Sequence, residues 1–222
     1  MYPRSVLLST TYLGPVQYFT KFLLYDEIWL ETHEHYSKQT YRNRCNIYGA
    51  NGKLTLTVPV LKGDMLKTLI PDLRIDYNRN WQKLHWKGIG SAYRSSPFFE
   101  FFTDEFAQFY SKKYVFLFDF NMEILMKILH LLDLKSEIKF TEKYELPVTS
   151  NVNDMRDSIH PKRSHRSDQD FAPIEYNQVF SNKHGYIANL SIIDLIFNTG
   201  PESVGILRRS SKPLEGLEPS KD

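Results

Sequence analysis

The sequence predicts a single α/β domain with a mixed, partly parallel sheet and a helical middle section. A strand–helix–strand pattern opens the chain over residues 5–32, and alternating apolar residues mark a further strand over residues 53–60. From Asn80 onward the spacing of apolar residues becomes helical. The 222 residues fit one large domain, and a hydrophobic content of 41% is sufficient to form its core.

The opening segment predicts two parallel strands joined by a helix. Residues 5–10 have the character of a short buried strand, and Pro15 suits the first turn of a helix, where its missing N–H leaves no hydrogen bond unmade. Apolar residues follow at helical spacing as far as Tyr25, and residues 27–32 form the next candidate strand. A helix of this length is sufficient for a crossover between parallel strands.

The clearest strand signal in the chain is the alternation over residues 53–60, which follows an Asn-Gly turn. We expect this strand to lie in one sheet with residues 5–10 and 27–32, and the first helix to pack on that sheet. Residues 72–77 are a candidate for another short strand.

Three helices are predicted in the middle of the chain. The first covers residues 81–93, the second begins near Pro97, and the third is capped by Asp119 or Asn121. The second helix carries a stripe of phenylalanines, which indicates a face in the core. The stripe consists of Phe98, Phe102, Phe106 and Phe109. Residues 137–141 then return to strand character.

The last third of the chain predicts a loop, a short helix and a tail. Residues 147–170 are polar and charged, which is typical of a long surface loop. Ser191 and Asp194 have capping-box spacing at the start of a short helix. We therefore expect one domain over residues 1–209 and a disordered tail over residues 210–222.

Composition and motifs argue against several classes of protein. No apolar run approaches the roughly 18 residues of a membrane-spanning helix, and the N-terminus lacks the features of a secretory signal. Cys45 has no partner for an internal disulfide, which predicts a cytoplasmic location. A net charge of +2 gives no indication of nucleic-acid binding. Phosphate-loop, dinucleotide and nucleophile-elbow motifs are absent, so no cofactor is expected.

One basic segment predicts an anion site. In an extended conformation Arg42 and Arg44 point to the same side and present two guanidinium groups, a geometry suited to phosphate or carboxylate. Lys38 and Asn43 add donors, and Lys83 near a helix start could join them. The alternative is a solvated basic surface with one structural salt bridge.

Three histidines are candidates for proton transfer. His33 and His35 would share a face of a strand and could also bind a metal, but no further cluster at ligand spacing completes such a site, so no metal is expected. Hydrogen bonding at a strand end is the favoured interpretation of this pair, and proton transfer stays open. His85 lies one helical turn from Trp81, which favours a packed, hydrogen-bonded side chain.

The order of several segments resembles the WbqC-like protein family. These segments are residues 12–19 (YLGPVQYF), 38–44 (KQTYRNR), 56–60 (LTVPV), 81–85 (WQKLH), 92–93 (AY), 97–99 (PFF) and 190–201 (LSIIDLIFNTGP). No single segment is very specific, but the ordered set is, and it extends over roughly residues 6–207. Many relatives carry paired aspartates where this chain has Thr32-His33. If those aspartates take part in catalysis in the relatives, His33 or His35 would have to take their role in this chain.

The resemblance implies a role in bacterial surface-polysaccharide synthesis, because the family occurs in gene clusters for O-antigen and related polysaccharides. Glycine (aminoacyl) transfer to a sugar has been proposed for some members. The implied substrate is a phosphate-bearing, nucleotide- or lipid-linked sugar, and a lipid-linked one would bring the protein into peripheral contact with the inner membrane.

On this hypothesis one pocket combines the basic segment with the start of the helix over residues 81–93. The substrate-binding residues are Lys38, Tyr41, Arg42, Asn43, Arg44 and Lys83, and the catalytic candidates are His33, His35 and His85. The alternatives are a non-catalytic binding or assembly protein of the same pathway and a nucleotidyl-transferase-like enzyme. The absence of an H-x-G-H motif disfavours the last of these.

Overall fold

The computed structural model describes residues 5–61, 67–144 and 152–212. The strands are β1 (Ser5–Leu8), β2 (Glu27–Leu30), β3 (Arg44–Gly49), β4 (Gly52–Thr57), β5 (Ile138–Phe140) and β6 (Val152–Asp154). The α-helices are α1 (Val16–Leu24), α2 (Trp81–Tyr93), α3 (Phe99–Ser111), α4 (Leu117–Leu131), α5 (Ser181–His184), α6 (Ile192–Thr199) and α7 (Ser203–Ser210). This combination confirms the α/β class.

The larger sheet is parallel, with the strand order β5-β2-β1-β6. β1 pairs with β2 in register from Ser5 opposite Glu27 to Leu8 opposite Leu30, and α1 forms the crossover between them. Val6 and Leu8 on one face of β1 and Leu7 on the other are all buried, as expected of a parallel strand covered on both faces. The predicted strand–helix–strand opening is therefore confirmed.

β4 belongs to a separate two-stranded hairpin, so the expectation that residues 53–60 join the main sheet was wrong. β4 pairs antiparallel with β3, from Arg44 opposite Thr57 to Gly49 opposite Gly52. The connection between the two strands is only two residues long, which favours pairing with the preceding segment. β3 escaped prediction because five of its six residues are buried and show no polar alternation.

Two further strand predictions differ from the structure. β6 lies within the predicted loop over residues 147–170 and pairs with β1, but it has only three residues and therefore carries no periodic signal. Residues 72–77 form no strand. Isolated bridges instead connect Arg74 to Phe116 and Val60 to Ile75.

The middle helices follow the prediction closely. α2 has the predicted bounds, and α4 begins at Leu117, slightly before the expected caps. Phe106 and Phe109 of the predicted stripe are buried. Asn80, whose side chain accepts a hydrogen bond from the backbone N–H of Lys83, caps α2.

The capping-box interpretation of α6 was wrong. The hydroxyl of Ser191 donates to the carbonyl of Leu13 at 2.7 Å instead of capping the helix. The carboxylate of Asp194 accepts hydrogen bonds from the hydroxyls of Tyr93 and Tyr176. Every residue of α6 is buried, so this short helix lies inside the protein and its polar groups bond to neighbouring elements.

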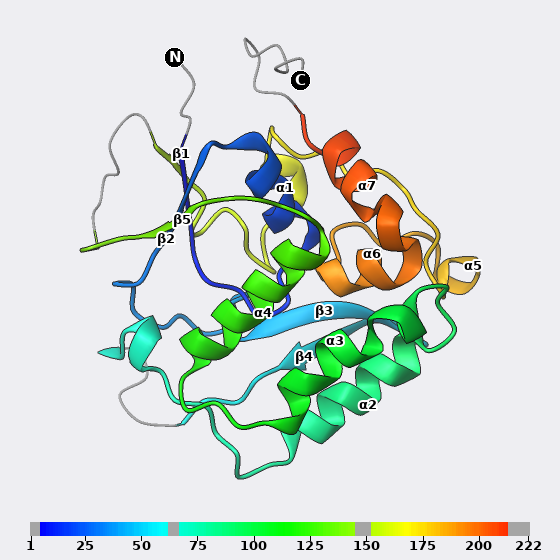
Figure 1. Cartoon of the computed structure of the whole chain (residues 1–222), viewed down its shortest axis with the longest axis horizontal. Helices are drawn as coiled ribbons and strands as arrows, with labels where there is room; N and C mark the ends of the chain where they lie inside the picture. Colours follow the sequence, from blue (N-terminus) through cyan, green and yellow to red (C-terminus); the bar gives the residue numbers. More distant parts are fainter. Residues whose placement is uncertain (1–4, 62–66, 145–151, 213–222) are drawn as a thin grey trace.

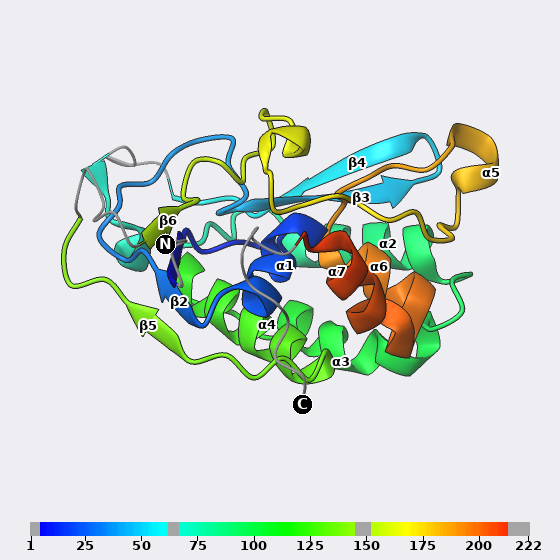
Figure 2. The same ribbon diagram turned by 90° about the horizontal axis from the view of Figure 1, so that it is seen from above.

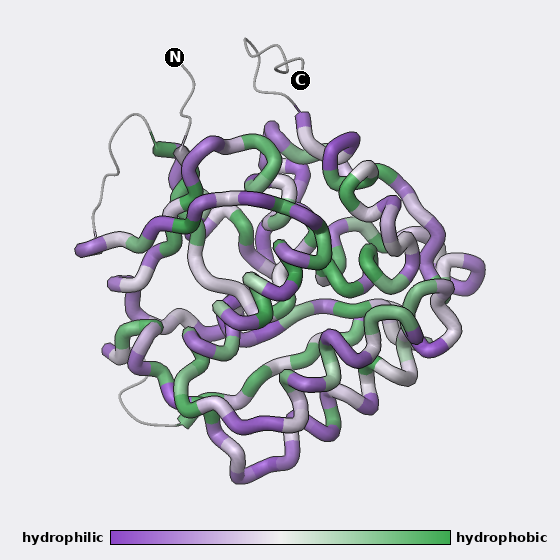
Figure 3. Tube along the Cα trace, viewed as in Figure 1, coloured by the Kyte–Doolittle hydropathy of each residue, from purple (hydrophilic) through white to green (hydrophobic). Residues whose placement is uncertain are grey.

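The parallel sheet lies at one end of the molecule, and the β3–β4 hairpin with α2, α3 and α6 lies at the other (Figures 1 and 2). α1 and α4 occupy the space between them, and Figure 3 shows the hydrophobic colour of α6. α7 continues to Ser210, the first residue of the predicted tail, and residues 213–222 of that tail lie outside the described residues.

Candidate functional site

A buried ion pair at the carboxyl end of β1 fixes the loop that follows β2. The guanidinium of Arg42 donates to both carboxylate oxygens of Glu34, with Nε 2.7 Å from Oε1. Its Nη2 also donates to the hydroxyl of Ser9 at 2.7 Å. The side chains of Arg42 and Glu34 are each only 6% exposed, so the charge of Arg42 is already neutralised inside the protein.

A second arginine forms a similar cluster at the carboxyl ends of β2 and β6. Nη1 of Arg156 lies 2.6 Å from the carboxylate of Glu31, and its Nε and Nη2 bond to Asp154 at 2.9 and 2.6 Å. The carboxylate of Glu31 also accepts hydrogen bonds from the backbone N–H of His33 and the hydroxyl of Thr141. Both clusters tie loops to the sheet through hydrogen bonds to protein acceptors.

The predicted pair of parallel guanidinium groups does not form. Residues 41–43 make a turn before β3, so Arg42 and Arg44 are not successive same-side residues of an extended strand. Arg42 is directed to Glu34, whereas Arg44, the first residue of β3, lines a pocket on the other side of this turn.

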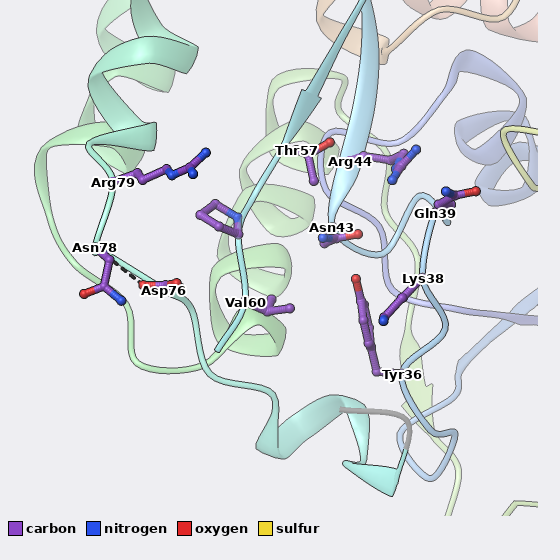
Figure 4. Close-up of a pocket in the computed structure, with 11 residues that line it drawn as sticks. Tyr36, Lys38, Gln39, Asn43, Arg44, Thr57, Val60, Asp76, Asn78 and Arg79 are labelled. Carbon is purple, nitrogen blue, oxygen red and sulfur yellow. Dashed lines mark hydrogen bonds between the residues drawn. The ribbon is translucent and has the colours of Figure 1, made fainter. Parts of the chain in front are cut away.

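This pocket has a volume of about 550 Å³, within the range of small-molecule sites. It lies where the loop after β2, the start of β3, the end of β4 and the segment before α2 meet (Figure 4). Its lining residues are Tyr36, Lys38, Gln39, Asn43, Arg44, Thr57, Pro59, Val60, Asp76, Asn78 and Arg79. Two walls face each other in Figure 4, one carrying Arg79 and the other carrying Lys38 and Arg44.

The pocket carries more positive charge than its own residues neutralise. Lys38, Arg44 and Arg79 line it, and within the described ranges none of them forms an ion pair. Nε of Arg44 is buried and has no hydrogen-bond partner among the described residues. Asp76 is the single carboxylate among the described lining residues, so this part of the pocket is suited to an anion.

Two uncharged polar residues, Asn43 and Tyr36, also line the pocket. Nδ2 of Asn43 donates to the carbonyl of Val58 at 2.8 Å, while its buried Oδ1 has no partner among the described residues. Burial raises the pKa of Tyr36, although the nearby guanidinium groups of Arg44 and Arg42 act in the opposite direction. Tyr36 is therefore a neutral hydroxyl at the pocket wall.

Three of the predicted substrate-binding residues, Lys38, Asn43 and Arg44, meet at this pocket, and the others lie elsewhere. Arg42 is engaged by Glu34, and Tyr41 is buried, which raises its pKa to about 12.

Lys83 is exposed on α2 and is not among the residues that line the pocket. Its backbone N–H donates a hydrogen bond to the side chain of Asn80, the N-cap of the helix. The structure thus separates basic residues that sequence spacing had grouped.

His85 is packed behind the pocket. Its Nδ1 lies 3.0 Å from the hydroxyl of Tyr12, and its ring is 5.1 Å from that of Trp81. Burial lowers its pKa to about 4, although a hydrogen bond with the carbonyl of Thr57 acts in the opposite direction. The imidazole is therefore neutral near pH 7. Its hydrogen bond to the backbone of Thr57 helps to position this residue of the pocket wall.

His33 and His35 lie on the loop that leads from β2 to the pocket. Nδ1 of His33 is 3.1 Å from the hydroxyl of Thr32, and His35 is exposed and forms an isolated bridge with Leu69. Neither histidine is among the pocket-lining residues.

Sequence reasoning missed one wall of the pocket, formed by Asp76, Asn78 and Arg79. The only local signal was a polar run before the α2 cap, and nothing in it indicated proximity to Lys38. Within the described ranges no group of His, Cys, Asp or Glu is arranged to hold a metal ion. No helix of the described segments has the length and apolarity needed to cross a membrane.

Together these features define an α/β protein with a cationic pocket on the loops that follow β2 and β4. Residues 10–166 match the model of the WbqC-like protein family. The chain belongs to this family. The resembling residues 190–201 lie beyond the matched span.

A curated relative gives no further indication of activity. An uncharacterized protein of Mycobacterium tuberculosis is 24% identical over 221 residues, a match that covers 89% of this chain and 91% of the relative. No solved structure shows a significant match.

Proposed function

We propose that this protein is a transferase that binds a phosphate-bearing activated sugar in the pocket and moves a small acyl or aminoacyl group, such as glycine, from an activated donor to an amine or hydroxyl of that sugar, with release of the donor's carrier. The observation that carries the proposal is the group of cations formed by Lys38, Arg44 and Arg79, none of which has a carboxylate partner among the described residues. Phosphate oxygens supply the charge and the acceptors that these donors lack.

The contrast between arginines supports this assignment. Arg42 and Arg156 are buried, and each donates to carboxylates through at least two guanidinium nitrogens, which is how this chain uses arginine for structure. Nε of Arg44 is a buried donor with no acceptor among the described residues. A buried donor without a hydrogen bond destabilises the folded protein unless a ligand supplies the acceptor.

Membership of the WbqC-like family adds the biological context. A role in O-antigen or lipopolysaccharide synthesis accounts for an activated sugar as ligand, and a cytoplasmic location follows because such sugars are made there. A lipid-linked acceptor would bring the protein to the inner membrane.

His33 or His35, on the loop that leads to the pocket, is proposed as the general base. It would accept the proton that the attacking amine or hydroxyl loses during the transfer. His85 is a poor candidate, because burial and its contacts with Tyr12 and Thr57 keep it neutral and engaged.

Calorimetric titration with inorganic pyrophosphate and a panel of nucleotide sugars tests the binding step. Lys38→Gln and Arg44→Lys are expected to weaken binding about tenfold or more, because each removes a charge or a guanidinium fork from the ligand. The matched control is Lys87→Gln, which removes an exposed charge from α2 outside the pocket.

The melting temperature of each variant separates a ligand role from a structural one. A ligand role leaves it nearly unchanged, whereas a structural role of Arg44 lowers it markedly. Absence of any phosphate-ligand binding by the native protein would overturn the proposal. Tight binding with no transfer of acyl or aminoacyl groups from activated donors would favour a non-catalytic binding protein of the same pathway.

A further inference from the structure

We infer that the sugar held by this pocket carries an amino group and that Asp76 recognises it. This inference rests on the proposed function and names the class of its substrate as an amino sugar. The described residues that line the pocket include three cations and one carboxylate. A pyrophosphate-linked sugar with one ammonium group has the complementary charges, because its anionic phosphates can face Lys38 and Arg44 while its ammonium faces the carboxylate of Asp76.

Asp76 is held rigidly at the pocket. Its backbone N–H donates to the carbonyl of Pro59 at 2.9 Å, and Pro59 itself lines the pocket. Its Oδ1 accepts from the backbone N–H of Asn78 at 2.8 Å, a turn that fixes the orientation of the carboxylate. This arrangement gives a negative group at a defined position on one wall.

The charge of Asp76 is not consumed by the protein. Arg79 is only three residues away and lines the same pocket, yet the described residues show no ion pair between Asp76 and Arg79 or any other cation. The turn uses one carboxylate oxygen, and an amide oxygen would serve that turn equally well. The local turn therefore does not account for the negative charge of this side chain, whereas a cationic group on a ligand would.

The positions of the charges determine the orientation of the ligand. Figure 4 shows Asp76 and Arg79 on one wall and Lys38 and Arg44 on the other, with Val60 between them. Phosphate oxygens bound by Lys38 and Arg44 leave the sugar to extend across the apolar floor towards Asp76. In this position the carboxylate distinguishes an amino sugar from one with a hydroxyl at the same carbon.

The test compares sugar 1-phosphates that differ in one group. Glucosamine 1-phosphate and 4-amino-4-deoxyglucose 1-phosphate are titrated against glucose 1-phosphate, with inorganic pyrophosphate as the reference for the cationic wall. The native protein is expected to bind at least one of the amino sugars about tenfold more tightly than glucose 1-phosphate.

Asp76→Asn keeps the turn acceptor and the side-chain shape and removes the charge. It is expected to abolish the preference, while pyrophosphate binds equally or more tightly. Asp72→Asn is the matched control, because it removes the same charge from an exposed position outside the pocket and should leave the preference intact.

The outcomes separate the two proposals. Failure of pyrophosphate to bind the native protein would refute the proposed function. If pyrophosphate binds but the native protein shows no preference for either amino sugar, the inference about Asp76 is refuted and the anion site stands. A preference that persists in Asp76→Asn likewise refutes the role of Asp76.

Discussion

Replacing Arg42 with methionine tests whether its ion pair with Glu34 is structural. Both side chains are 6% exposed, so Arg42→Met leaves a carboxylate buried without its cation. Breaking a buried pair from one side costs about 3–5 kcal/mol. In a protein of this length each kcal/mol lowers the melting temperature by about 2–4 °C, so a decrease of about 6–20 °C is expected in differential scanning fluorimetry.

The double variant Glu34→Met with Arg42→Met provides the sharper measurement. Two apolar side chains of similar volume remove both charges, so the double variant should recover most of the stability lost by either single change. Lys112→Met is the control, because Lys112 pairs with Glu123 at the surface and its loss should cost at most about 1 kcal/mol. If Arg42→Met costs no more than this control, or if the two single losses add in the double variant, the structural interpretation of Arg42 is incorrect.

Three further predictions concern buried or strained residues. Because the pKa of His85 is lowered to about 4, the unfolded chain binds a proton that the folded protein excludes as the pH falls from about 6.5 to 4. Urea denaturation should therefore show up to about 3 kcal/mol less stability at the acidic end, and His85→Gln should lose most of this dependence. Cys45 is buried and burial raises its pKa, so a thiol reagent should label it only in denaturant; rapid labelling of the native protein would contradict its placement. Gln39 has φ of 62° at the pocket rim, so Gln39→Gly should raise the unfolding free energy by about 0.5–1 kcal/mol; a loss of stability would show that the side chain contributes more than the strain costs.

The candidate site illustrates how far local sequence reasoning extends. The basic segment containing Lys38 and Arg44 was identifiable because residues 38–46 include several basic residues and no acidic one. The acid that neutralises Arg42 is Glu34, only eight residues earlier, and the turn over residues 41–43 decides that Arg42 meets it while Arg44 does not. The sequence predicted a cationic site but could not distinguish its ligand-facing arginine from its structural one.

Elements whose signal is local could be predicted from the sequence. β1, α1 and β2 follow from apolar spacing and Pro15, and α2 follows from its cap and periodicity. Features that depend on contacts between distant segments became visible only in the folded protein. β6 joins the sheet through β1, β4 pairs with β3, and Asp76 and Arg79 approach Lys38 and Arg44 only because the segment before α2 packs against the end of the hairpin. Such contacts leave no trace in the spacing of neighbouring residues, because they depend on how separate elements bury their apolar faces together.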